Sequence, residues 1–330
     1  MGVQGVFMLQ GRALIAATKV FAQEQRGRSW WVFLSTLVGL VGLMALTVVV
    51  VPWWGKLGAG VLAGLMFCRM FIIYHDHQHG AIFRGSRVMK WVMSGFGVLI
   101  LNPPSTWNSS HNHHHKHNTK IRGASIGSFP VMTVKGYEQA TWWEKTAYAG
   151  ERHPLTIMLA WVSVFFYSMT LRSLIHKPRQ HMDCGLAVVI HVGVWIWLAM
   201  VFPTAMIYSF VVPLGISTIL GAYLFYAQHN YPAVDLGDQS EWDYVNAALK
   251  ASSFMDLSPV MHWFTGNIGY HHIHHLNSRI PFYRLPEAMA ALAELQSPGK
   301  TDLSVGSIWQ CLRLKLWDEK QGKMVGFNGR

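Results

Sequence analysis

Charged side chains are scarce in this chain. Only 13% of its 330 residues are Asp, Glu, Lys or Arg, and 51% are hydrophobic, whereas about 25% of the residues of a soluble domain are charged. Charged residues this few cannot cover the surface of a soluble protein of this size. Part of the chain must therefore face lipid. Acidic residues are the scarcer sign, and the net charge is +11. This balance favours a membrane face or an acidic partner, and no nucleic-acid-binding motif supports a role with RNA or DNA.

Cysteine is also scarce, and two familiar sequence signals are missing. The three cysteines, Cys68, Cys184 and Cys311, lie far apart and match neither a disulfide framework nor a zinc-ligand spacing. We expect them to be packed or idle thiols in a reducing compartment. The N-terminal stretch has no short apolar run followed by a small-residue cleavage site, so no removable signal peptide is expected.

Long apolar runs are abundant. Crossing a bilayer as a helix takes about 20 residues, and four runs approach or exceed that length. They lie at about 32–54, 57–74, 185–202 and 204–226. Only a few residues separate the members of each pair, which predicts two transmembrane hairpins. The second run carries Arg69 near its end, where the side chain could extend to the interface.

The distribution of Lys and Arg predicts the orientation of these spans. Residues 1–31 hold four of them, 75–184 hold twelve and 227–330 hold nine, whereas the loop after the first span holds only Lys56. The sequence therefore predicts that the termini, the central loop and the tail are cytoplasmic. We treat the whole chain, 1–330, as a single membrane domain.

Two shorter apolar runs, 91–104 and 155–171, complicate the count of spans. The first is too short to cross a bilayer. A crossing by the second would move the C-terminal third to the opposite side, against the charge distribution. Both are predicted to lie in or near the interface.

Histidine is concentrated in three clusters that share one predicted side of the membrane. The clusters hold twelve of the eighteen histidines and read HDHQHG (75–80), SHNHHHKHN (110–118) and HHIHH (271–275). Residues three or four apart share a helical face. The positions that meet this spacing are His75 and His79, then His111, His114 and His115, and then His271, His274 and His275.

Three such clusters predict a shared metal centre. Neutral imidazole suits iron, copper, zinc and nickel, and many uncoordinated imidazoles would repel one another on protonation. A single histidine-rich run is more often a solvated loop, but three runs on one side, two of them with identical spacing, favour a site. Four histidines, His77, His113, His117 and His272, point off the common faces and are not expected to be ligands. Asn267 lies one helical turn before His271.

These residues resemble the three histidine boxes of the membrane fatty acid desaturase family, H-x(3,4)-H, H-x(2,3)-H-H and H-x-x-H-H. HDHQHG fits that family's H-D-x-x-H-G, and Trp107 precedes the second box as in W-x-x-x-H-x-x-H-H. Residues 263–287 are similar to the third-box region of bacterial acyl-lipid desaturases of the delta-12 or delta-5 kind. The resemblance covers about residues 30–300.

The resemblance implies an all-α integral membrane protein, with four transmembrane helices in two hairpins and a cytosolic helical cap that holds a di-iron site. It implies residence in the bacterial inner membrane, two non-haem iron ions and molecular oxygen as co-substrate. It also implies that His229 is a further ligand beside the eight box histidines, and that Asn267 sits beside one iron, directly or through water. Asp76 would accept a hydrogen bond that orients a ligand imidazole.

The implied reaction is oxygen-dependent desaturation of a long-chain fatty acyl group, esterified in a membrane lipid. The chain has no H-P-G-G haem-binding segment and no dinucleotide fingerprint, so electrons should come from a separate ferredoxin or b-type cytochrome. Hydroxylation or ketolation of a lipid or carotenoid by the same di-iron machinery stays open, because histidine spacing does not distinguish these outcomes. A membrane metal transporter or sensor is a more distant alternative. Transporters tend to place ionisable residues near the middle of the bilayer, whereas these spans contain few ionisable residues besides His191 and Arg69.

Overall fold

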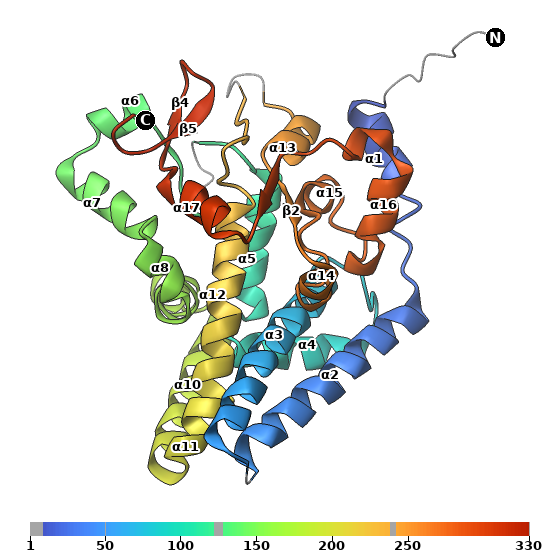
Figure 1. Cartoon of the computed structure of the whole chain (residues 1–330), viewed down its shortest axis with the longest axis vertical. Coiled ribbons are helices and arrows are strands. Elements are labelled where there is room, and N and C mark those ends of the chain that lie inside the picture. Colours follow the sequence, from blue (N-terminus) through green and yellow to red (C-terminus); the bar gives the residue numbers. More distant parts are fainter. Residues whose placement is uncertain (1–8, 50, 122–127, 238–241, 330) are drawn as a thin grey trace.

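A computed structural model describes residues 9–49, 51–121, 128–237 and 242–329 and shows a mostly helical protein (Figure 1). The helices of the first half are α1 (Gly11–Thr18), α2 (Arg26–Val48), α3 (Trp53–Gln78), α4 (Arg87–Leu99), α5 (Pro104–Lys116), α6 (Val134–Gln139), α7 (Trp142–Glu151), α8 (Pro154–Met158), η1 (Trp161–Leu171) and α9 (Arg172–His176). The helices of the second half are α10 (Met182–Val201), α11 (Pro203–Met206), η2 (Ile207–Val211), α12 (Val212–Ala227), α13 (Tyr244–Lys250), α14 (Pro259–Phe264), α15 (His271–Leu276), η4 (Phe282–Arg284), α16 (Leu285–Ala291), η5 (Ala293–Leu295) and α17 (Val305–Arg313).

Four helical stretches are long and apolar enough to cross a membrane, which confirms the predicted number. They are α2, α3, α10 and the run Pro203–Ala227 that joins α11, η2 and α12. The first runs from Arg26 to Val48, so it begins and ends about six residues before the predicted 32–54. It ends ahead of Pro52, because proline cannot continue a helix. Residue 50 lies outside the described residues. The second runs from Trp53 to Gln78 and so extends beyond the predicted 57–74 at both ends.

Two glycines on α3 allow it to lie against the last span. A Cβ atom at Gly60 would approach the Tyr208 carbonyl oxygen to 2.7 Å, and one at Gly64 would approach Ile216 Cβ to 2.7 Å. Small residues four apart let two membrane helices pack with their backbones close together. This contact fixes the end of α3 relative to the end of α12.

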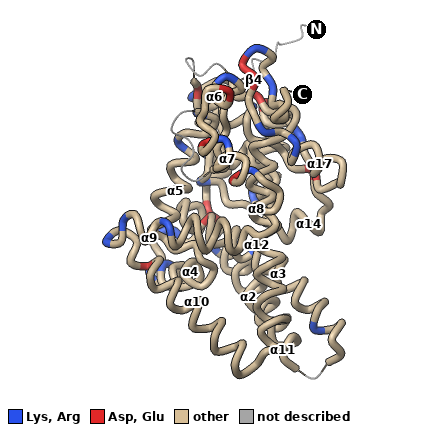
Figure 2. Tube along the Cα trace, turned by 90° about the vertical axis from the view of Figure 1, so that its left-hand side faces the viewer, with Lys and Arg blue, Asp and Glu red and all other residues tan. Residues whose placement is uncertain are grey.

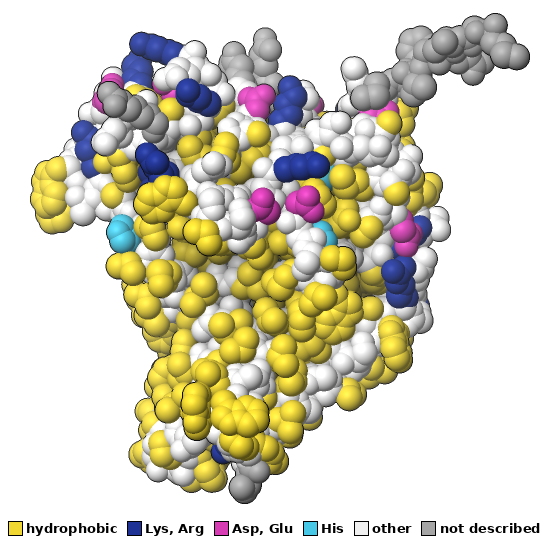
Figure 3. Space-filling view, viewed as in Figure 1, with side chains coloured by type: hydrophobic (Ala, Val, Ile, Leu, Met, Phe, Trp, Pro, Cys, Tyr) yellow, Lys and Arg dark blue, Asp and Glu magenta, His cyan; other side chains and the backbone are white. Residues whose placement is uncertain are grey.

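The charged and apolar surfaces of the protein lie at opposite ends. Figure 2 shows Lys and Arg mainly in the upper part of the molecule, where α6 and β4 lie, and few along the spans below. Figure 3 shows hydrophobic side chains covering the lower part of the same molecule. No Lys or Arg occurs between residues 180 and 249, and Lys56 and Arg69 are alone between 29 and 83. The distribution fits spans that are surrounded by lipid and a cap that is not.

The two short apolar runs form helices that run across the direction of the spans. The run 155–171 lies within α8 and η1, which Figure 1 views nearly end-on and Figure 2 views from the side. The run 91–104 lies mostly in α4, which buries Met89 and Met93 and exposes Trp91. Neither is among the candidate spans. An apolar outer face on a crosswise helix is typical of a helix at a membrane surface.

The described part of the chain forms five short strands that were not expected from the sequence. The strands are β1 (Met132–Thr133), β2 (Phe254–Asp256), β3 (Lys300–Asp302), β4 (Leu316–Asp318) and β5 (Lys323–Val325). β1 pairs in parallel with β4, which pairs antiparallel with β5, and β2 pairs in parallel with β3. Each strand has only two or three residues, too few for an alternating pattern to be recognised. They connect distant parts of the cap and leave the helical character of the fold unchanged.

Arg69 does not extend to the interface, contrary to the sequence-based expectation. Its side chain is buried: Nε donates to Thr36 Oγ1 on α2 at 3.1 Å, and Nη1 donates to the Trp263 carbonyl oxygen on α14. The guanidinium also lies 4.1 Å from the centroid of the Trp263 ring. Protein acceptors replace water because Arg69 faces the junction of three helices. It therefore ties two spans to the segment that leads into the third histidine box.

Replacing Arg69 with Leu should lower the temperature of thermal unfolding in detergent by several degrees. The substitution leaves buried acceptors without a donor, which costs about 1–3 kcal/mol. Thr36→Val should have a smaller effect, because the bond to the Trp263 carbonyl remains. Lys56→Met, at the opposite end of α3, is the matched control and should unfold like the wild type. Wild-type unfolding of Arg69→Leu would show that these bonds do not stabilise the fold.

Candidate metal centre

The first histidine box lies at the end of a membrane-spanning helix. His75 occupies the last turn of α3, and His79 is the residue at which the helix ends. The next residue, Gly80, has a φ of +68°, the left-handed conformation that commonly terminates helices. The ring centroids of His75 and His79 lie 4.6 Å apart. The expected shared face is therefore present.

The other histidines reach the same place from three further segments. The second box lies on α5, which Pro104 begins at the first helical position, where its missing N–H is tolerated. The third box fills the short helix α15, and His229 lies just beyond the end of α12. These segments are far apart in sequence and meet above the spans (Figure 1).

The nine histidines expected at the centre separate into two groups, each of which could hold a metal ion. Within each group the candidate ligand nitrogens all lie within 4.8 Å of one another. The five-histidine group consists of His75, His79, His111, His115 and His274. The four-histidine group consists of His114, His229, His271 and His275.

This division does not follow the boxes. Adjacent helical residues point about 100° apart, so His114 and His115 turn toward different groups. Residues four apart share a face, which keeps His271 and His275 together while His274 joins the other group. The second and third boxes therefore each contribute to both groups.

The spacing of the imidazole nitrogens fits metal coordination. In the five-histidine group the Nε2 atom of His111 lies 3.1 Å from that of His79 and 3.0 Å from that of His115. In the four-histidine group the Nε2 atom of His229 lies 3.1 Å from that of His114 and 3.0 Å from that of His271. Two nitrogens bound at right angles to one ion, at about 2.0–2.1 Å each, are about 3 Å apart. The side chains are thus already arranged as neighbouring ligands.

Hydrogen bonds on the outer ring edges of two histidines favour the coordinating form. His75 Nδ1 lies 3.0 Å from the Asp76 carboxylate, and His229 Nδ1 lies 3.1 Å from the Ala251 carbonyl oxygen. A carbonyl oxygen can only accept, so His229 must donate from Nδ1, and its Nε2 lone pair faces the group. The same arrangement at His75 is the one by which metal-binding histidines are usually oriented.

Burial keeps the imidazoles neutral. It lowers the pKa of His79 to about 3 and that of His229 to about 4. For the remaining members outside the spans, burial, together with repulsion from neighbouring imidazoles, holds the pKa well below its usual value. These members are His111, His114, His115, His271, His274 and His275. Neutral imidazole is the form that binds a metal.

Asp76 and Asn267 meet at the backbone of Phe282, beside the five-histidine group. The second carboxylate oxygen of Asp76 accepts from the Phe282 N–H at 2.6 Å, and Asn267 Nδ2 donates to the Phe282 carbonyl at 3.2 Å. Asn267 does not occupy a helical turn before His271, as its spacing suggested, because its φ is +53° and α15 begins only at His271. It belongs to neither histidine group.

The four histidines expected to point off the common faces join neither group. His77 Nδ1 lies 3.4 Å from the Ile82 carbonyl, and His272 Nε2 lies 3.0 Å from the Leu295 carbonyl. The rings of His113 and His117 stack on each other with centroids 4.0 Å apart. Each therefore has another local role in the packing of its segment.

Two aromatic residues cover the histidines and were not assigned that role from the sequence. The Trp107 ring lies 4.0 Å from that of His111 and is fully buried, and the Phe225 ring lies 5.0 Å from that of His114. Trp107 precedes His111 by four residues, and Phe225 precedes His229 by four. An aromatic residue one turn before a ligand is a signal that could have identified both.

A third group of possible ligands, His181, Asp183 and Cys184, lies outside the two histidine groups. Hydrogen bonds account for it. Asp183 accepts from the Ser105 N–H at 3.0 Å and from the Ser105 hydroxyl at 2.5 Å, and His181 Nδ1 lies 2.7 Å from that hydroxyl. The carboxylate therefore accepts from a backbone N–H in the first turn of α5 that has no partner within the helix, and it attaches α5 to α10. Cys184 is buried, as expected for a packed thiol.

Comparison with known proteins identifies the family. The family model described as "Fatty acid desaturase" matches residues 51–305. The chain belongs to the fatty acid desaturase family. A "Fatty acid desaturase" of Bacillus subtilis (strain 168) is 29% identical over 323 residues, which cover 96% of this chain and 90% of that protein. Membership makes the protein a membrane oxidoreductase, and its histidine clusters are compatible with a metal site.

Other members of the family that resemble this chain carry names that describe lipid substrates. An "sn-1 oleoyl-lipid 12-desaturase" of Anabaena variabilis is 26% identical, with 82% of this chain and 78% of that protein covered. An "sn-1 acyl-lipid omega-3 desaturase (ferredoxin)" of Synechocystis sp. (strain ATCC 27184 / PCC 6803 / Kazusa) is also 26% identical, with 85% and 79% covered. The similarity therefore extends over most of the length of each protein.

Removing one histidine from each group should affect metal binding separately. The geometry predicts about two Co²⁺ equivalents for the wild type, because imidazole ligands suit cobalt as well as iron. His274→Ala and His114→Ala should each lose about one equivalent, and the double variant should lose both. His113→Ala is the matched control and should bind like the wild type. Plasma mass spectrometry and cobalt ligand-field absorption measure the stoichiometry. Complete loss in either single variant would mean that the groups do not bind independently.

Proposed function

We propose that the two histidine groups hold two iron ions and that the protein desaturates a long-chain fatty acyl group of a membrane lipid with molecular oxygen. The observation that carries the proposal is the pair of adjacent, mostly buried, all-imidazole groups in a member of this family. Their nine members, His75, His79, His111, His114, His115, His229, His271, His274 and His275, are the proposed ligands.

The reaction needs an oxidant because an unactivated methylene C–H bond is not appreciably acidic. The iron ions would supply the oxidising chemistry. Dioxygen, two electrons and two protons would combine with the two hydrogen atoms removed from neighbouring carbons, giving one carbon–carbon double bond and two molecules of water. The protein would contribute position and the exclusion of water.

The roles of individual residues follow from the contacts around the ligands. Asp76 would hold the His75 ring through Nδ1 and the third-box segment through the Phe282 N–H. The Ala251 carbonyl would hold His229 in the same way. Trp107, buried against the first and second boxes, would exclude water from the five-histidine group. Asn267 is proposed to lie beside one iron, directly or through water.

A lipid substrate is supported by the position of the histidines and by the relatives. His75 lies in the last turn of a membrane-spanning helix, so an acyl chain in the bilayer has only a short distance to reach the centre. Two relatives are named for acyl-lipid substrates. The concentration of Lys and Arg at the histidine-bearing end supports a cytoplasmic orientation in a bacterial inner membrane.

A separate acidic electron carrier is the proposed donor, either a ferredoxin or a small b-type cytochrome. One relative's name includes ferredoxin. The net charge of +11 would attract an acidic carrier and raise its rate of association.

Lipid analysis of a desaturase-free bacterial host tests the proposed reaction. Cells that express the wild type should accumulate new unsaturated fatty acids, and mass spectrometry of their methyl esters locates the double bond. His274→Ala should lower the product by about 100-fold or more, since loss of even a residue that orients a ligand costs about 10–100-fold. His113→Ala is the matched control and should retain activity. Hydroxylated fatty acids without new double bonds would instead support the alternative function, hydroxylation of a lipid.

The dependence of turnover on salt tests the proposed donor. With an acidic ferredoxin, the KM for the donor should rise with ionic strength, because exposed charges are screened. Lys116→Glu combined with Lys250→Glu, near the four-histidine group, should raise that KM about tenfold at low salt. Lys56→Glu, at the opposite end of α3, is the control and should leave it unchanged. A KM independent of both salt and charge reversal would contradict electrostatic docking.

A further inference from the structure

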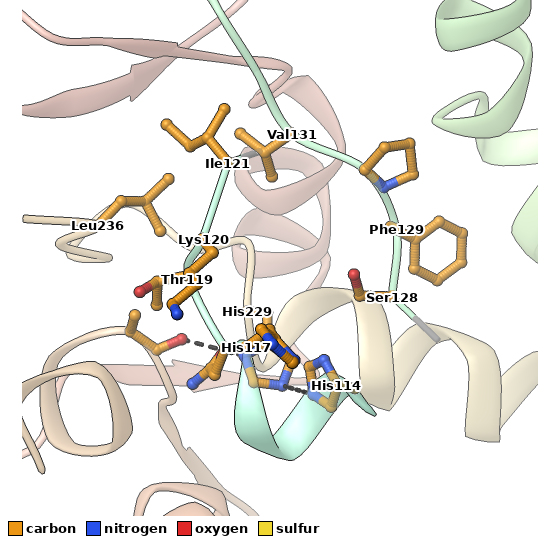
Figure 4. Close-up of a pocket in the computed structure, with 13 residues that line it drawn as sticks. His114, His117, Thr119, Lys120, Ile121, Ser128, Phe129, Val131, His229 and Leu236 are labelled. Atoms are coloured by element: carbon orange, nitrogen blue, oxygen red, sulfur yellow. Dashed lines mark hydrogen bonds between the residues drawn. The ribbon is translucent and has the colours of Figure 1, made fainter. Parts of the chain in front are cut away.

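A cavity opens beside the four-histidine group, and the proposed function has so far assigned it no role. It encloses about 510 Å³, including its mouth, and His114 and His229 lie on its floor (Figure 4). The contact between their Nε2 atoms, 3.1 Å long, is the contact through which this group would share an ion. Val131 lies at the top of the lining, with Leu236 and Phe129 on opposite sides (Figure 4).

The cavity reaches only one of the two groups. None of the five histidines of the other group lines it. The group that it reaches has four imidazoles rather than five. An ion with about six coordination positions would therefore have more positions free for an exogenous ligand on the side that faces the cavity.

The lining indicates what kind of molecule could pass. Its charged residue is Lys120, whose ammonium group lies 4.2 Å from the centroid of the Trp242 ring, and most of the remaining wall is apolar. No Asp or Glu is among the lining residues that the structure describes. A lysine beside apolar walls disfavours metal cations and favours small neutral or anionic molecules.

We propose that this cavity is the route by which a small neutral or anionic reactant reaches the four-histidine group from the Lys- and Arg-rich end of the protein. Dioxygen is the neutral reactant that the proposed function requires, and the inference rests on that function. The acyl chain would approach separately, from the spans. The route would therefore serve the small reactant without passing through the lipid path.

Azide binding to the iron-loaded, purified protein tests the route without measuring turnover. The rate of appearance of the azide-to-iron absorption band reports access to the metal. Val131→Trp, which fills the cavity, should slow binding about tenfold, equivalent to a modest added barrier. Phe129→Ala, which widens it, should speed binding. Asn246→Trp, on an exposed position outside the cavity, is the matched control and should bind at the wild-type rate.

Charge reversal separates a specific route from general access. Lys120→Glu should slow azide binding about tenfold at low salt, but should leave the binding rate of nitric oxide, which is neutral, unchanged. Equal azide rates in the wild type, Val131→Trp and Phe129→Ala would overturn the proposal. So would unchanged azide rates accompanied by a raised KM for the lipid, which would assign the cavity to the substrate head group.

A metal-free measurement distinguishes failure of the route from failure of the proposed function. In the metal-free protein, diethyl pyrocarbonate should modify His114 and His229 faster than His75 and His274, as read by mass spectrometry of peptides. Val131→Trp should remove that difference, and Asn246→Trp should not. Uniform modification would overturn the route even if iron binds. Selective modification in a protein that binds no iron would support the route and would contradict only the proposed di-iron centre.

Discussion

Eight closely packed imidazoles whose neighbouring Nε2 atoms lie 3.0–3.2 Å apart, with His75 beside them, are the constraint on which this structure depends. A neutral imidazole carries one N–H, so either that proton or a metal ion can lie between two neighbouring ring nitrogens, while burial lowers the pKa values and disfavours a second proton on each ring. Contacts among the histidines alone do not define the arrangement. It must be imposed by the segments that carry them, and those segments are anchored outside the centre.

The anchors differ in chemistry because the segments lie in different surroundings. Within the lipid-facing part, Gly60 and Gly64 let α3 pack closely against the last span. At the junction with the cap, Arg69 connects α2 and α3 to the segment before the third box through buried hydrogen bonds. Nearer the histidines, the Asp76 carboxylate reaches both His75 and the backbone of Phe282. Each anchor joins segments that are far apart in sequence, so the loss of one anchor would displace several ligands together.

The sequence predicted the features that depend on local geometry and missed those that depend on how helices face one another. Helical spacing was enough to select the eight box histidines and to set aside four others, because i, i+4 geometry survives in any fold, whereas His229 was expected only from the family resemblance. It could not divide them into groups, since the assignment of His114 and His115 depends on the directions in which α12 and α3 approach α5. The helical position expected for Asn267 was wrong because Gly266 and Asn267 both adopt positive φ values, +53° each. Arg69 was placed at the interface because burial partners on other helices have no local signature.

The two groups also meet different surroundings, and this bears on how a centre of this kind could handle unlike reactants. The five-histidine group includes the end of a membrane span and packs against Trp107, whereas the four-histidine group borders a cavity lined in part by Lys120. An acyl chain is long, apolar and confined to the bilayer, while the proposed oxidant and electron donor would arrive from the Lys- and Arg-rich end. Under the proposed function, separate approaches would keep water away from the C–H bond that reacts while small molecules still reach the metal. The division of the histidines between two environments, rather than their number alone, would then make both requirements compatible.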